Sequence, residues 1–104
     1  MGNVQTKCWE VMFTGKARKQ KTKLPPNILD ALVTLLLDLS RKGPEVAMWP
    51  NFGRLQGKRG VYHCHLNKGK PRYVAVWKVT DREIKLIEVR YVGTHENADY
   101  RRID

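Results

Sequence analysis

Residues 61–92 read VYHCHLNKGKPRYVAVWKVTDREIKLIEVRYV, and this stretch decides the fold. It holds three runs rich in β-branched and aromatic residues, a composition that favours strands. The runs span residues 61–66, 72–79 and 83–92. The links between them are only a few residues long, and links this short join antiparallel neighbours because parallel strands need a long crossover. The sequence therefore predicts an antiparallel meander over this segment.

The residues before the meander predict one strand, one or two helices and a loop. Apolar side chains alternate over 8–13, the period of a half-buried strand. Residues 16–23 are basic and made of good helix formers, which predicts a short helix. From Pro25 to Gly43, apolar residues recur at intervals of three and four, which predicts a long amphipathic helix. Residues 43–60 are rich in Gly and Pro and predict a loop.

Together these elements predict an α+β fold, with one or two N-terminal helices packed on an antiparallel β-sheet in the order β-α-α-β-β-β. A chain of 104 residues, 41% of them hydrophobic, fits a single domain, 1–104. The longest apolar run is too short to span a bilayer and no signal-peptide pattern opens the chain, so we expect a cytoplasmic protein that does not bind membranes. Two cysteines, Cys8 and Cys64, are expected as reduced thiols in or near the core.

The charge of the chain is strongly positive and clustered. Twenty Lys and Arg against ten Asp and Glu give a net charge of +10, and residues 54–78 hold seven basic side chains and no acidic one. The segment also contains Tyr and His side chains that can stack on bases while the cations meet phosphates. A merely solvated basic face is the alternative, but we favour nucleic acid as the partner. The seven basic residues are Arg54, Lys58, Arg59, Lys68, Lys70, Arg72 and Lys78.

The three histidines are candidates for chemistry. His63 and His65 stand two apart in a predicted strand, so both project from one face, roughly 6–7 Å apart, and we expect this face to be the wet one. Cys64 should point to the other face, so we do not expect the three residues to bind zinc. His95 directly follows the last predicted strand, although nothing in the sequence alone brings it to the other two. A polar surface role is the alternative for the strand pair.

If the histidines meet, RNA cleavage is the chemistry that suits them best. Attack of a ribose 2′-hydroxyl on phosphorus needs a base, an acid for the departing 5′-oxygen and cations for the growing charge. Imidazole can fill either proton-transfer role near neutral pH. The sequence has no carboxylate cluster of the kind that holds magnesium, so we expect a metal-independent ribonuclease without cofactors. Arg90 is either a phosphate clamp or half of a cross-strand ion pair, and its nearness to His95 favours the clamp.

Four segments resemble a known family. They are WPNFGRL at 49–55, VYHCHL at 61–66, RYVAVW at 72–77 and YVGTHE at 91–96. All four are similar to segments of the RelE/ParE superfamily of bacterial type II toxins, and the likeness extends over nearly the whole chain. The resemblance implies a small α+β endoribonuclease that cuts mRNA, usually in the ribosomal A site, inhibits translation and is held inactive by a cognate antitoxin.

The resemblance also implies roles for single residues. His63 and His65 occupy positions that alternate as basic residues in the family, His95 matches its catalytic residue after the last strand, and Tyr100 matches an aromatic that stacks on the target base. The phosphate-stabilising residue is left open between Arg72, Lys70 and Arg90, because the 67–71 loop is longer than in better-known branches. Catalysis is thus expected from His95, His63, His65 and Arg72. RNA binding is expected from Arg54, Lys58, Arg59, Lys68, Lys70, Arg90 and Tyr100.

Two other functions fit a chain of this type. The ParE branch of the superfamily poisons DNA gyrase without cutting nucleic acid, although three histidines grouped with cations speak against that function here. A basic RNA-binding module without catalysis is the other alternative. For the toxin, the expected partners are mRNA, the ribosome and an antitoxin protein, whose acidic segment would complement the basic surface.

Overall fold

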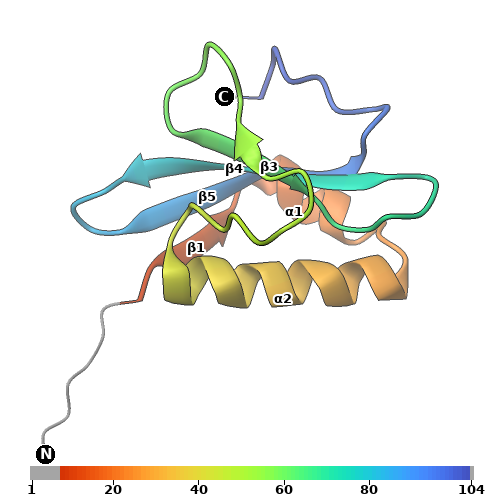
Figure 1. Ribbon diagram of the computed structural model, residues 1–104, viewed down its shortest axis with the longest axis horizontal. Coiled ribbons are helices and arrows are strands. Elements are labelled where there is room, and N and C mark those ends of the chain that lie inside the picture. Colours follow the sequence, from red (N-terminus) through yellow and green to blue (C-terminus); the bar gives the residue numbers. More distant parts are fainter. Residues whose placement is uncertain (1–7, 104) are drawn as a thin grey trace, which may run out of the picture.

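A five-stranded sheet organises the chain, and both helices pack on one of its faces (Figure 1). The computed structural model describes residues 8–103. The strands lie side by side in the order β1-β5-β4-β3-β2. In chain order the elements are β1 (Glu10–Phe13), α1 (Gly15–Lys21), α2 (Pro26–Lys42), β2 (Gly53–Arg54), β3 (Val61–His65), β4 (Tyr73–Asp81) and β5 (Leu86–Thr94).

The directions of the strands confirm the meander and correct the first strand. β3, β4 and β5 pair antiparallel, as predicted from the short links between them. β1 instead runs parallel to β5, from Glu10 beside Leu86 to Phe13 beside Val89. The sheet is therefore mixed rather than wholly antiparallel. A long connection containing both helices separates β1 from the rest of the sheet, so chain connectivity does not impose its direction.

The 43–60 segment is a loop, as predicted, except for one short strand. Within it, β2 pairs antiparallel with β3, placing Gly53 beside His63 and Arg54 beside Tyr62. The sequence around Gly53 has no alternating pattern, so the pairing is tertiary in origin. It forms one edge of the sheet next to the strand that carries two histidines.

The two helices begin and end at local signals. At the start of α1 the Thr14 hydroxyl accepts a hydrogen bond from the Ala17 amide at 3.0 Å. α2 starts directly after Pro25 and ends at Gly43, whose φ of +92° favours glycine. A Cβ at Gly43 would also lie 3.0 Å from Nε1 of Trp9. Within residues 8–103 we find no helix long and apolar enough to cross a membrane.

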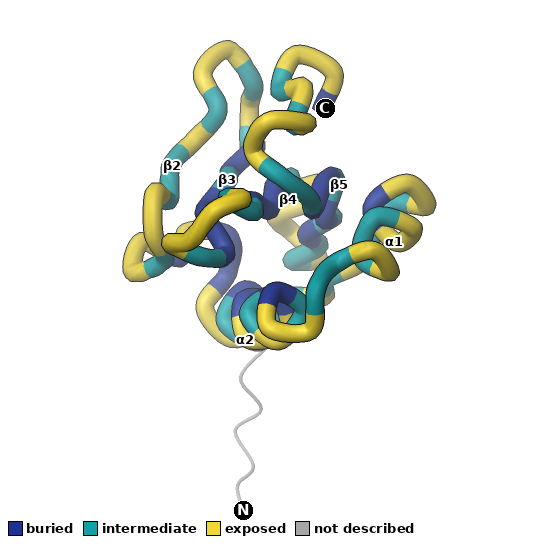
Figure 2. The backbone as a smooth tube through the Cα atoms, turned by 90° about the vertical axis from the view of Figure 1, so that its right-hand side faces the viewer, coloured by how far each residue is buried: buried dark blue, intermediate teal, exposed yellow. Residues whose placement is uncertain are grey.

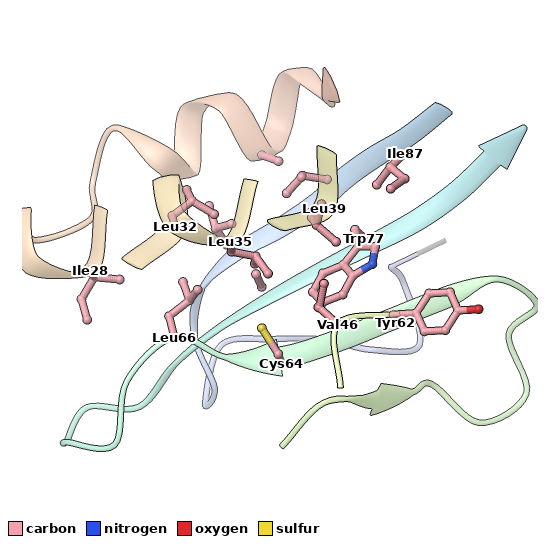
Figure 3. Close-up of a cluster of buried hydrophobic side chains, with 14 residues drawn as sticks. Ile28, Leu32, Leu35, Leu39, Val46, Tyr62, Cys64, Leu66, Trp77 and Ile87 are labelled. Atoms are coloured by element: carbon pink, nitrogen blue, oxygen red, sulfur yellow. The ribbon is translucent and has the colours of Figure 1, made fainter. Parts of the chain in front are cut away.

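The main core lies between α2 and the sheet (Figure 3). Leu32, Leu35 and Leu39 project from α2 at helical spacing and are fully buried. They face Trp77 of β4, whose indole Nε1 donates to the Pro44 carbonyl at 3.0 Å. Burial of these large side chains is the principal source of stability for a domain of this size.

The two cysteines have different environments. Cys64 is buried in the helix-facing core, as predicted, and burial raises the pKa of its thiol to about 12. Cys8 is exposed, contrary to the expectation that both lie in or near the core. Cys8 alternates with Trp9 along the chain entering β1, and Trp9 is the one that packs against the core.

The opposite face of the sheet is covered by the C-terminal segment, residues 95–103, rather than by a helix (Figure 2). Ile103 packs there against Val61, Val74, Val76 and Tyr91 in a second, smaller cluster. We expected this face to be wet, and for His65 that prediction is wrong, because the side chain is only 8% exposed. The C-terminal residues have no hydrophobic period of their own, so their packing could not be anticipated.

The helix-facing core predicts a contrast between two leucines of α2. Leu35 is fully buried, whereas Leu37 is 49% exposed. Leu35→Ala should lower the free energy of unfolding by about 2–5 kcal/mol, because it leaves a cavity beneath the sheet. Leu37→Ala, the matched control, should change it by about 0.5 kcal/mol or less. Urea unfolding followed by circular dichroism measures both, and equal effects would contradict the assigned face of α2.

Candidate active site

The strand histidines lie on the face of the sheet opposite the helices. His63 pairs with Val76 of β4, and His65 pairs with Val74. These valines in turn pair with Tyr91 and Gly93 of β5. Because paired residues share a face, the row through His65 crosses the sheet and ends at Gly93, two residues before His95.

A β-bulge in β5 puts His95 on this same face. Trp77 of β4 pairs with Val89, but the next pair joins Val76 to Tyr91, so Arg90 is an extra residue in β5. Before the bulge, Val89 faces the helices, and after it Tyr91 faces away from them. Without the extra residue, Tyr91 and Gly93 would both face the helices. The chain would then enter His95 on the helix side of the sheet.

The three imidazoles and one phenol ring form a cluster. The rings of His65 and His95 lie 5.7 Å apart, centre to centre, at an angle of 84°. Tyr100 of the C-terminal segment lies 6.2 Å from the His95 ring and 6.1 Å from the His63 ring. The structure thus brings together four residues that the sequence singled out, two from β3 and two from the C-terminal segment.

The chain leading into His95 is held by hydrogen bonds to two backbone carbonyls. The Tyr91 hydroxyl donates to the Thr94 carbonyl at 2.8 Å, and the His95 amide donates to the Arg72 carbonyl at 2.7 Å. The tyrosine side chain reaches Thr94 by crossing Gly93, where a Cβ would lie 2.6 Å from the hydroxyl oxygen. Glycine at position 93 therefore leaves the space that the Tyr91 contact needs.

A cavity of about 310 Å³ opens between His65, His95 and Arg72, and Lys70 and Glu96 also line it. The Arg72 side chain is held in place from three directions. Its Nη1 lies 3.3 Å from Nδ1 of His65, its Nε donates to the Gly69 carbonyl, and its Nη2 donates to the Lys68 carbonyl. A cation is thereby fixed beside two imidazoles at an open, positively charged cavity.

The contact with Arg72 determines the state of His65. Guanidinium has no acceptor atom, so Nδ1 of His65 must accept, which leaves the ring neutral with its proton on Nε2. Burial lowers the pKa of His65 from its ordinary value of 6.5, and the positive charge of Arg72 lowers it further. His65 is thereby held in the form that can accept a proton.

His63 lies behind the cavity rather than at it. Its Nε2 lies 3.4 Å from the position a Cβ would take on Gly53, and its Nδ1 is buried with no hydrogen-bond partner among residues 8–103. Burial, followed by the nearby His95, lowers its pKa from 6.5. The His63 ring therefore packs against Tyr100 behind the cavity, while His65 and His95 line the open cavity itself.

The other predicted RNA-binding residues are dispersed. Arg54 and Arg59 line a separate cavity, and the exposed Lys68 contributes its carbonyl to Arg72. Lys58 donates to the Arg101 carbonyl at 3.0 Å and so fastens the C-terminal segment. Arg90 pairs with Glu88 of its own strand at 2.8 Å, rather than across strands, and lines a third cavity with Lys16 and Arg102.

Three residues of the site were missed at the sequence level. Glu96 lines the histidine cavity, and Tyr91 with Gly93 sets the path of the chain into His95. The Tyr-x-Gly-Thr-His spacing is visible in the sequence. The bulge at Arg90, which decides the face of the sheet on which these residues lie, is not. Among residues 8–103 we find no group of three or more His, Cys, Asp or Glu side chains arranged to hold a metal ion.

The fold matches those of RelE and YoeB proteins of known structure. The chain superimposes on a mutant of the E. coli toxin RelE in the free state with a TM-score of 0.72 and 22% identity, covering 92% of this chain and 94% of that one. It superimposes on a chain of the RelBE2 toxin–antitoxin complex from Mycobacterium tuberculosis with a TM-score of 0.62 and 27% identity, covering 85% of this chain and 99% of that one. The match to the YoeB dimer from Staphylococcus aureus has a TM-score of 0.66 and 15% identity, and it covers 84% of this chain and 97% of that one. No protein-family model and no curated protein sequence matches the chain. The chain therefore has a RelE-like toxin fold, as the resemblance implied.

The Tyr91 contact predicts a local effect on His95. Tyr91→Phe removes the hydrogen bond to the Thr94 carbonyl and should lower the free energy of unfolding by about 1 kcal/mol. The backbone order parameter of His95 from ¹⁵N relaxation should fall, because one of the contacts that fix the chain there is lost. Tyr73→Phe, on the helix-facing side of the neighbouring strand, is the control. An unchanged order parameter in Tyr91→Phe would show that the contact does not position His95.

The environment of His65 predicts its titration. By NMR, His65 should titrate below 6.5 in the wild-type protein, and Arg72→Gln should raise its pKa by removing a neighbouring positive charge. Because His63 and His65 both hold protons less tightly when folded, the free energy of unfolding should fall as the pH drops below about 6.5. A His65 midpoint at or above 6.5 would contradict the hydrogen bond from Arg72.

Proposed function

We propose that this protein is the toxin of a type II toxin–antitoxin system, a metal-independent endoribonuclease that cleaves mRNA at the ribosome and so inhibits translation. The observation that carries the proposal is the pair of imidazoles, His65 and His95, 5.7 Å apart at a cavity that also contains Arg72 and Lys70. A RelE-like fold is consistent with this function, but the site residues are what argue for cleavage.

In the proposed reaction His65 is the general base. Its depressed pKa keeps the ring neutral at physiological pH, as a base requires. In the free protein its Nδ1 accepts a hydrogen bond from Arg72. When a phosphate enters the cavity, Arg72 donates to a phosphate oxygen instead, which frees the Nδ1 lone pair to take the proton of the ribose 2′-hydroxyl. The 2′-oxygen then attacks phosphorus.

His95 is the general acid in this scheme. The side chain is exposed and lines the cavity opposite His65, so it can reach the leaving group of a phosphodiester bound there. It donates its proton to the 5′-oxygen as the phosphorus–oxygen bond breaks, giving a 2′,3′-cyclic phosphate and a 5′-hydroxyl. Arg72 and Lys70 stabilise the charge on the phosphate, and Tyr100 stacks on a base next to the cut.

The proposed partners follow from charge and fold. An excess of ten positive charges favours association with ribosomal RNA, to which the basic 54–78 and 16–23 segments would bind. The matched RelBE2 structure is a toxin–antitoxin complex, and another match is a YoeB–YefM complex. By analogy we propose an antitoxin whose acidic segment neutralises the basic surface of this chain.

The experiment is inducible expression in bacteria, with new mRNA 5′ ends mapped by primer extension. The wild-type protein should arrest growth and produce cuts, whereas His95→Ala should lower the cleavage rate by about 10²–10⁴-fold, the usual contribution of a proton-transfer group. Arg41→Ala, at the exposed end of α2, is the control and should retain activity. Circular dichroism establishes that both variants fold.

Two results would contradict the proposal. Growth arrest with inhibited DNA supercoiling and no RNA cuts would identify a gyrase inhibitor instead. RNA binding and growth effects that are unchanged in His95→Ala would identify a binding module without catalysis.

A further inference from the structure

A second basic cavity lies at the far end of β3 and β4 from the histidines. It has a volume of about 420 Å³ and is lined by Arg54 of β2, Arg59 of the following turn, Lys78 of β4 and Arg82 of the turn beyond β4. Gly60 lines this cavity and His65 lines the other, and the five steps along the chain from one residue to the other span about 17 Å at the rise of a strand. The two cavities are therefore separate sites on one sheet.

The charge of this cavity is all of one sign. Four cations from four different parts of the chain line it, and none of the described residues that line it is acidic. Like charges repel one another, by about 1 kcal/mol at 4 Å in bulk water. An anion bound between them would convert this repulsion into attraction.

One of the four cations is held by the core. Nη2 of Arg82 donates to the Tyr62 hydroxyl at 3.3 Å, and that hydroxyl lies 3.3 Å from the Glu45 carboxylate. The Tyr62 ring packs against both Phe52 and Trp77, with centroids 5.8 and 6.4 Å away, and those two rings also contact each other at 6.2 Å. The guanidinium is thus anchored before any ligand arrives, which reduces the entropy lost on binding.

The lining selects the ligand class. Arginine guanidinium forms paired hydrogen bonds with phosphate oxygens, and three of the four cations are arginines. The aromatic residue of the lining, Tyr62, is only 2% exposed, so it offers no surface on which a base could stack. Large exposed apolar side chains, which a peptide ligand would bury, lie elsewhere, at Met12, Val33, Leu37, Met48 and Ile84. The contact would be with the sugar–phosphate backbone and independent of base sequence.

We propose that this cavity is a second RNA-binding site, which holds the phosphodiester backbone at the opposite end of β3 from the linkage that is cut. The inference rests on the proposed function only in taking RNA as the substrate. It assigns Arg54, Arg59, Lys78 and Arg82 to docking and leaves cleavage to the histidine cavity. The site lets the protein bind the backbone of folded RNA of any sequence while a separate single-stranded RNA segment enters the active site.

The test is the salt dependence of binding to an RNA that cannot be cut. The probe is a fluorescent hairpin with 2′-O-methyl groups throughout, which removes the nucleophile, and anisotropy gives Kd at several KCl concentrations. Arg54→Gln/Arg82→Gln should weaken binding about tenfold or more at low salt. A plot of the logarithm of the association constant against log[KCl] has a negative slope. The magnitude of this slope should decrease by about 1.8 in the variant, because each lost phosphate contact contributes about 0.9.

The matched control is Arg41→Gln/Lys42→Gln, which removes the same charge from the exposed end of α2. It should lower the slope by far less, and equal losses in both double variants would overturn the site in favour of general electrostatic attraction. Unchanged affinity and slope in Arg54→Gln/Arg82→Gln would also overturn it. A polyglutamate peptide is tested in parallel, and loss of peptide binding with RNA binding intact would identify an acidic protein as the occupant instead.

These outcomes are distinguishable from failure of the proposed function, since the binding assay needs no cleavage. A wild-type protein that never cuts RNA but shows the slope difference would retain the docking site and lose the ribonuclease. Thermal unfolding should show that Arg54→Gln/Arg82→Gln is folded, so that a loss of affinity reports on the cavity and not on the fold.

Discussion

The site depends on one irregularity in the pairing of β4 with β5. Arg90 is an extra residue in β5, and a one-residue shift in a strand exchanges the two faces for everything that follows. The part of β5 before Arg90 can therefore bury Val89 against the helices, while the part after it presents Tyr91 and the chain leading to His95 on the opposite face. One strand serves both the core and the cluster of imidazoles.

The same arrangement explains the chemistry of the cluster. The C-terminal segment folds over the outer face and brings Tyr100 to His63 and His95. Partial burial then disfavours the charged form of the strand histidines, and Arg72 adds a fixed positive charge beside His65. A neutral imidazole, an exposed imidazole and an anchored guanidinium face one cavity. These groups have the complementary roles that cleavage through a 2′-hydroxyl needs.

Local patterns predicted most of the fold and the identity of the site residues. Helical spacing located α2, and short links fixed the antiparallel order of β3, β4 and β5. The parallel direction of β1, the pairing of β2 and the packing of Ile103 depend on contacts between distant segments, which leave no local pattern. For the same reason the sequence could name His63, His65 and His95 but not say which of them meet at a cavity. Arg90 was placed with the histidines because it is near His95 in sequence, whereas the structure places it in a different cavity beside Glu88.

The central claim is that a neutral His65 takes the proton of the attacking ribose 2′-hydroxyl, while an exposed His95 protonates the departing 5′-oxygen of the same linkage. The chemistry of the RNA ends at a cut tests this claim most directly, because it reports which nucleophile attacked phosphorus. Mass spectrometry of the fragments should find a 5′-hydroxyl on one side of the cut and a 2′,3′-cyclic phosphate, or the 3′-phosphate formed from it, on the other. Fragments carrying a 5′-phosphate would show that water attacked instead, and the proposed roles of both histidines would be wrong.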